Sequence, residues 1–276
     1  LQRRMPDRAV DRCLLLFRRR QRDLHFVANE HGQLAERRFF ELRSLGAEAS
    51  YRIPDRNTQS HGLNKELIEE IAAKKVQLLI TCDCGINDHA AVDFAVSKGL
   101  DVIITDHHTP DPDRFPHKAI AVINPHLPQC DYPEKNLSGS AVAFKVVQAL
   151  GVENIEKYLE IATIGLVADC MELTGENRIL TQLGLQALKK TQWSPLKKLF
   201  ALTQTAPHTI NEQTIGFVIA PRLNAASRLG NVLSATQLFL GPEKEQAQHL
   251  KQLEDINQDR KLRTEKAFTQ SLSQVK

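Results

Sequence analysis

The chain has 276 residues, 42% of them hydrophobic and 25% charged, which suffices for one large or two modest globular domains. Its five cysteines are odd in number and scattered, which argues against a disulfide framework. No run of about 18 apolar residues is present, and the arginine-studded start lacks the apolar stretch of a secretory signal. We therefore expect a cytoplasmic protein without a membrane span.

The net charge of +3 is unevenly distributed. The first 43 residues carry arginine but no lysine and are clearly positive, whereas the remainder is slightly acidic. Bulk charge therefore gives no argument for nucleic-acid binding, and any basic track must be local.

Residues 1–40 read unlike the rest of the chain. They show no clean strand and no helical periodicity, and their basic character fits either a nucleic-acid-binding arm or a disordered, non-native leader. We favour the leader, and we expect that this segment does not pack as the first strand and helix of the domain that follows.

From residue 41 the pattern becomes orderly. Short β-branched or apolar runs alternate with amphipathic helical stretches, which predicts an α/β fold with a parallel sheet, right-handed crossovers and helices on both faces. The expected strands cover residues 49–53, 76–80, 102–104 and 119–123, and the expected helices cover 64–75, 88–98, 138–149, 155–167, 180–190 and 195–203.

Acids and histidines follow three apolar runs. Asp83 follows the run ending at Ile80, Asp106-His107-His108 follow the next run, and Asp169 follows the apolar stretch 161–167. Ligands collect outside the carboxyl ends of parallel strands, and this set of oxygens and imidazoles suits a divalent metal for phosphoryl chemistry. Each acid alone is more typical of a turn or helix cap, so the conjunction carries the prediction.

Cys82 and Cys84 flank Asp83 and raise the alternative of thiolate ligation of zinc. With no second close cysteine pair, we favour a structural role for both.

The C-terminal third is expected to be helical. In the stretch 210–230, Arg222, Asn224 and Arg228 recur at near-helical spacing, which fits either contacts to nucleic-acid phosphates or charges on a helix surface. Residues 243–275 predict one long charged helix.

At these residues the chain resembles the DHH phosphoesterase family, and within it the RecJ branch of exonucleases. The resemblance runs from about residue 41 to 267 and rests on ordered motifs: LRSLGAEASYRIPDR, HGLNKE, LLITCDCGIND, VIITDHHTP, INPHLPQCDYP, LSGSAVAFKV, LVADCMELTGENR and IAPRLNAASRLGN. It implies a catalytic domain over 41–205 and a helical connector over 206–276 leading to a second domain that this chain lacks.

The resemblance also implies an activity and a set of roles. The activity is 5′-to-3′ removal of nucleotides from single-stranded DNA by two-metal catalysis with Mn²⁺ or Mg²⁺, by a monomer working with single-strand-binding protein and a helicase. Asp83, His107 and Asp169 would bind metal, His108 would contact the scissile phosphate, and Asp106 would orient the two histidines. The residues expected to bind substrate phosphate are Arg56, His108, Arg222, Asn224 and Arg228.

The family's first motif, an acidic element after the first strand, is not found. Permitted codons for Phe17–Phe26, shifted by one nucleotide, can read FDADSATST, which resembles the family's FDADGATST, so a disrupted reading frame is one explanation. Activity of this chain is then expected to be impaired. Two alternatives stay open: a DHH phosphoesterase acting on oligonucleotides, cyclic dinucleotides or pyrophosphate, and a non-catalytic nucleic-acid-binding fragment.

Overall fold

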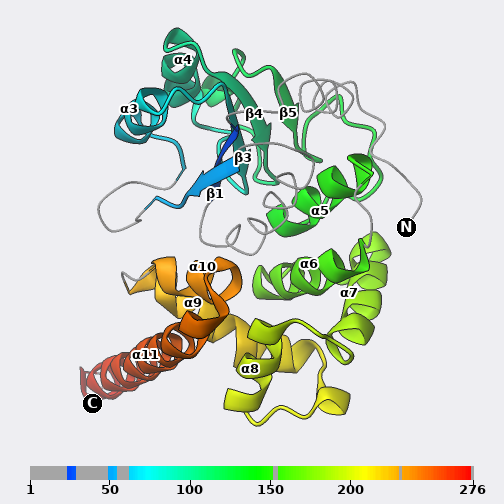
Figure 1. Ribbon diagram of the computed structural model, residues 1–276, viewed down its shortest axis with the longest axis vertical. Coiled ribbons are helices and arrows are strands. Elements are labelled where there is room, and N and C mark those ends of the chain that lie inside the picture. The colour runs from blue at the N-terminus through cyan, green and yellow to red at the C-terminus, as the bar shows by residue number, and fades with distance from the viewer. Residues whose placement is uncertain (1–23, 29–48, 55–61, 152–154, 230–231, 275–276) are drawn as a thin grey trace.

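A parallel five-stranded sheet organises the first half of the chain (Figure 1). The computed structural model describes residues 24–28, 49–54, 62–151, 155–229 and 232–274. The strand order is β2-β1-β3-β4-β5, with every neighbouring pair parallel. The strands are β1 (Leu24–Ala28), β2 (Ala49–Arg52), β3 (Leu78–Cys82), β4 (Asp101–Thr105) and β5 (Ala121–Ile123).

Strand β1 corrects one expectation. Residues 24–28 were expected to lie in a segment without a strand, yet they form a central strand that pairs with β2 and β3. A five-residue LHFVA segment beside a run of arginines gives little local signal, and its pairing partners lie far along the chain. The rest of the segment 1–40 lies outside the described residues.

Helices cover both faces of the sheet, as the sequence predicted (Figure 1). Alternate strand residues face opposite sides because side chains in a strand have a period of two. Leu79, Val102 and Ile104 pack in one cluster with α3 and α4, whereas Leu78, Ile80 and Ile103 pack in another with α5 and α6. These helices are α3 (Lys65–Ala73), α4 (His89–Ser97), α5 (Gly139–Ala149) and α6 (Glu156–Ala168).

The remaining helices form a second body on the α6 side of the sheet (Figure 1). They are α7 (Gly175–Leu188), α8 (Ser194–Leu202), the π-helical segment η5 (Thr214–Ile219), α9 (Ala220–Arg228), α10 (Val232–Leu240) and α11 (Gln246–Gln274), with short 3₁₀ turns η3 (Pro112–Arg114), η4 (Pro207–Thr209) and η6 (Glu243–Glu245). Helix α10 was not predicted, and α7 begins five residues earlier than expected. The long C-terminal helix is as expected, and its residues from 261 to 274 are exposed.

Helix α6 contributes to two hydrophobic clusters. Its residues Tyr158, Leu159 and Ala162 pack with the sheet and α5, whereas Ile161 and Ile164 pack with the helical body. Both sides of one helix are therefore buried, and the end of α6 is fixed relative to the sheet. No helix in the described part of the chain has the length and apolar content to cross a membrane.

Candidate metal centre

The candidate site lies where two strands end at the switch point of the sheet. The chain passes from β1 outward to β2 and then returns to place β3 on the other side of β1. Ligands of open parallel sheets bind at such a reversal, outside the carboxyl ends of the strands. Asp83 follows β3 directly, and Asp106 follows β4.

Asp83 is held in an uncommon backbone conformation. Its φ of 63° lies in the left-handed region, and its backbone N–H donates to Thr105 O at 2.9 Å, so the end of β3 is tied to the end of β4. The residue is only 2% exposed. A left-handed non-glycine residue costs about 1 to 3 kcal/mol, and such residues concentrate at functional sites.

Asp106 organises the turn that carries the histidines. Its Oδ1 accepts from the backbone N–H of His107 at 2.7 Å and of His108 at 3.2 Å, and its Oδ2 accepts from Ile86 N at 3.0 Å. The carboxylate is 1% exposed. Asp106 therefore fixes the histidine turn from below, which supports its expected orienting role.

His107 brings the three segments together. Its Nε2 lies 3.1 Å from Asp83 Oδ1 and 3.4 Å from Asp169 Oδ2. Asp169 is the last residue of the α6 end, where its backbone N–H donates to Gly165 O. The three residues expected to bind metal therefore converge, although they stand 24 and 62 positions apart along the chain.

His108 lies closer to this group than its expected phosphate role required. Asp83, His107 and His108 each offer a ligand atom, and these atoms lie within 4.8 Å of one another. His108 Nδ1 is 2.6 Å from Asp106 Oδ1, and its backbone oxygen accepts from Asn124 Nδ2 at 2.8 Å. Asn124 was not singled out in the sequence, and its position directly after β5 was the available signal.

The electrostatics of the site favour positive charge. The hydrogen bond to Asp106 raises the pKa of His108 to about 9. Burial lowers the pKa of His107, but the hydrogen bond and charge of Asp83, with the charge of Asp169, outweigh it and leave this pKa raised. For Asp106, burial raises the pKa, but the hydrogen bond and charge of His108 give a net lowering. The acids thus create a field that attracts a cation.

Cys82 and Cys84 are both buried beside this centre. Burial is the main cause that raises the pKa of the Cys84 thiol well above its usual range, and the nearby carboxylates raise it further. Its Sγ lies 3.8 Å from Val27 O. The thiolate needed for zinc ligation is therefore disfavoured, which supports the structural interpretation of Cys84.

The residues expected to bind phosphate have different surroundings. Arg56 lies outside the described residues. Arg222 Nε donates to Glu254 Oε2 at 2.6 Å, and its Nη1 donates to Val218 O, so this guanidinium joins α9 to α11. Asn224 is half-buried, and its backbone oxygen accepts from Ser227. Arg228 is exposed in the last turn of α9.

Arg222→Ala is expected to lower the free energy of unfolding by about 1 to 3 kcal/mol, because it leaves the carboxylate of Glu254 without its cation. Arg263→Ala is the matched control, since its pair with Asp259 is exposed and is worth less than about 1 kcal/mol. Urea unfolding followed by circular dichroism measures both. Equal stability of the two variants would show that the Arg222 pair has no structural weight.

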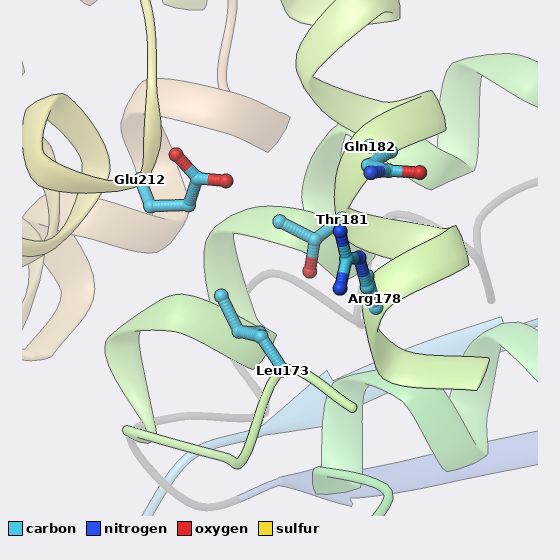
Figure 2. A pocket seen from close by; sticks show the side chains of 5 residues that line it. All are labelled: Leu173, Arg178, Thr181, Gln182 and Glu212. Carbon is cyan, nitrogen blue, oxygen red and sulfur yellow. The ribbon is translucent and has the colours of Figure 1, made fainter. Parts of the chain in front are cut away.

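A cavity of about 240 Å³ lies beside the segment that follows Asp169. Its lining residues are Leu173, Arg178, Thr181, Gln182 and Glu212 (Figure 2). Figure 2 shows Arg178, Thr181 and Gln182 along one helix, with Glu212 across from them. None of the five was predicted as a site residue, so the cavity and the metal centre are lined by different side chains.

The place of the family's first acidic motif can now be located along the chain. Ala28, the last residue of β1, pairs with Cys82, the residue before Asp83. The sequence then continues Asn29-Glu30-His31, without the aspartates of the expected motif. These residues lie outside the described part of the chain.

Comparison with known proteins agrees with this geometry. The family model described as the DHH family, N-terminal domain, matches residues 24–171. The chain belongs to the DHH family. The match begins at β1 and ends two residues after Asp169, so it covers the whole candidate centre.

Individual relatives of this DHH-family chain carry one name. The chain is 36% identical over 235 residues to the single-stranded-DNA-specific exonuclease RecJ of Bacillus subtilis (strain 168), a match covering 85% of this chain and 30% of that protein. A crystal structure of exonuclease RecJ bound to manganese matches with a TM-score of 0.86 and 30% identity, over 98% of this chain and 70% of that one.

A further solved structure is RecJ in complex with Mn²⁺ from Thermus thermophilus, with a TM-score of 0.83 and 28% identity, over 99% of this chain and 41% of that one. The chain spans less than half the length of the curated relatives it matches. What those proteins do as wholes is therefore a proposal for this chain.

Proposed function

We propose that this chain is the catalytic part of a metal-dependent exonuclease that hydrolyses phosphodiester bonds of single-stranded DNA in the 5′-to-3′ direction. The observation that carries the proposal is the convergence of Asp83, His107 and Asp169 at the switch point of the sheet. Family membership and the names of the relatives support the same reaction class.

The donor set fits the proposed cofactor. Carboxylate oxygens and imidazole nitrogens suit Mn²⁺, and carboxylates suit Mg²⁺, whereas a thiolate set would have pointed to zinc. The ligand atoms of Asp83, His107 and His108 lie within 4.8 Å of one another, which is close enough for one ion to contact all three. A cation held there would supply an activated water and neutralise charge on the phosphate.

The side chains divide this work. Asp83, His107 and Asp169 hold the cation, and Asp106 keeps both histidines in place through its backbone contacts. The side chain of His108 is 53% exposed, so it is placed to reach a scissile phosphate outside the centre. Without the aspartates expected after β1, we propose one metal site of full strength rather than two, and impaired activity.

The phosphate contacts are proposed on the family resemblance. Arg56 and Arg228 supply guanidinium groups that can hold a phosphate through two hydrogen bonds. Asn224 supplies an amide, and Arg222 acts through the position it gives α9, because its guanidinium is bound to Glu254. We further propose a cytoplasmic monomer that works with single-strand-binding protein and a helicase.

Nuclease assays test the proposal directly. With Mn²⁺, the chain is expected to release nucleotides slowly from the 5′ end of single-stranded but not double-stranded DNA, and Asn29→Asp/His31→Asp is expected to raise the rate at least tenfold by restoring two acids after β1. His107→Ala in that variant should abolish the reaction.

Each other outcome separates the alternatives. Cleavage of dinucleotides or pyrophosphate alone would favour a phosphoesterase for small substrates. DNA binding without cleavage in every variant would favour the non-catalytic fragment, which the absence of the first acidic motif motivates. Degradation at full rate by the unaltered chain would show that it does not need that motif.

A further inference from the structure

Three close contacts run from the metal centre through successive helices. The first turn of α5 meets Asp83 at Gly139, where a β-carbon would overlap the carboxylate. The next residue, Ser140, fits against Gly165 of α6, where a β-carbon would lie 2.5 Å from Ser140 Cβ. Thr163 of α6 fits against Gly184 of α7 in the same way.

The first two contacts lie between the two carboxylates of the centre. Gly139 touches Asp83, and Gly165 lies one helical turn before Asp169, whose backbone N–H donates to Gly165 O at 3.0 Å. Asp83 comes from β3 and Asp169 from α6, so the first turn of α5 separates the two elements that supply them. His107 Nε2 bridges the same two carboxylates on the other side.

We infer that Gly139, Ser140 and Gly165 are positioning residues that set the spacing of Asp83 and Asp169, and with it the size of cation that the centre accepts. This rests on the proposed metal-dependent function, which it deepens. Protein interiors are close-packed, so a helix that gains a methyl group at such a contact moves as a body. A shift of α6 carries Asp169 with it.

Ser140 is itself fixed, which makes it a suitable spacer. Its Oγ lies 2.9 Å from Ser138 Oγ and donates to Ala162 O at 3.3 Å, and the residue is 3% exposed. Ser138 caps α5 by accepting from Ala141 N. The spacer is thus tied to both helices that it separates.

Cation size gives a readout that general destabilisation does not share. Mg²⁺ binds oxygen at about 2.0 to 2.1 Å with strict geometry, whereas Ca²⁺ accepts about 2.3 to 2.6 Å with flexible geometry. A wider centre therefore loses affinity for Mg²⁺ and Mn²⁺ more than for Ca²⁺. The ratio of Mn²⁺ to Ca²⁺ affinity reports the spacing of the carboxylates.

The experiment measures Mn²⁺ and Ca²⁺ binding to the full chain by titration calorimetry. Gly165→Ala is expected to weaken Mn²⁺ binding at least tenfold and to lower the Mn²⁺ to Ca²⁺ affinity ratio. Gly184→Ala is the matched control, because it crowds α6 and α7 with a similarly tight contact away from the carboxylates. Adding Ser140→Gly to Gly165→Ala removes the overlap and should restore most of the affinity and the ratio.

Ser140→Gly alone covers the case in which Gly165→Ala does not fold, since it creates no overlap. It is expected to lower the Mn²⁺ to Ca²⁺ ratio about threefold or more by leaving the spacing loose. Unchanged ratios in folded Gly165→Ala or Ser140→Gly, or an equal change in Gly184→Ala, would overturn the positioning role. Failure of the unaltered chain to bind Mn²⁺ would instead overturn the proposed function.

Discussion

His107→Ala should reduce Mn²⁺ affinity by about a hundredfold or more. Residues that only support metal ligands cost about ten to a hundredfold when they are changed, so loss of the imidazole that joins Asp83 and Asp169 should cost at least as much. The variant also leaves two carboxylates facing each other without the group between them.

Calorimetry and thermal melting measure this effect independently. At a Mn²⁺ concentration a hundred times the dissociation constant, binding stabilises the folded chain by about 2.7 kcal/mol, and His107→Ala should lose that stabilisation. His117→Ala is the control, because His117 is an exposed histidine in the loop after the same strand. Equal Mn²⁺ affinity of the two variants would remove His107 from the centre.

Lys145→Met should destabilise the chain by about 3 to 5 kcal/mol, the largest stability change that we expect from a single substitution outside the apolar core. Lys145 of α5 forms an ion pair with Glu176 at the start of α7, and its side chain is 1% exposed. Tyr132, itself buried, donates to the same carboxylate. Removal of the cation leaves the carboxylate in a largely dry site.

Chemical denaturation compares this variant with Lys157→Met. Lys157 also lies over a tyrosine ring, that of Tyr158, but it is exposed, so its loss should change stability by less than about 0.5 kcal/mol. Lys145→Met/Glu176→Gln should recover part of the loss, because the second change removes the unpaired charge. A loss below about 1 kcal/mol for Lys145→Met would contradict the assigned weight of this pair.

The main features of the sheet and the metal centre were predictable because their signals are local. Each of the strands β3 and β4 has a continuous apolar run, and the parallel order brings Asp83 and the Asp106 turn to the same edge. The family motifs supplied the roles. Helix boundaries were less well predicted, and α7 begins at Gly175 because Glu176 and Asn177 are anchored by contacts to residues 134 and 136.

What could not be predicted depends on partners distant in sequence. Strand β1 exists because β2 and β3 offer it hydrogen-bonding edges on both sides, which its own five residues do not reveal. Arg222 has the spacing of a phosphate ligand, but Glu254, 32 positions away, binds it. The contact of Gly139 with Asp83 depends on how α5 docks, and no sequence pattern gives that.

The double burial of helix α6 has a consequence for cooperativity. The sheet and the helical body each have a hydrophobic cluster of their own, yet α6 contributes side chains to both. Neither part can lose its cluster while the other keeps α6 fully packed, so the free energy of each is coupled to that of the other. The chain should consequently melt in one calorimetric transition, and a ligand bound at the end of α6 should protect amides of α8 and α9 from hydrogen exchange as well as those of the sheet.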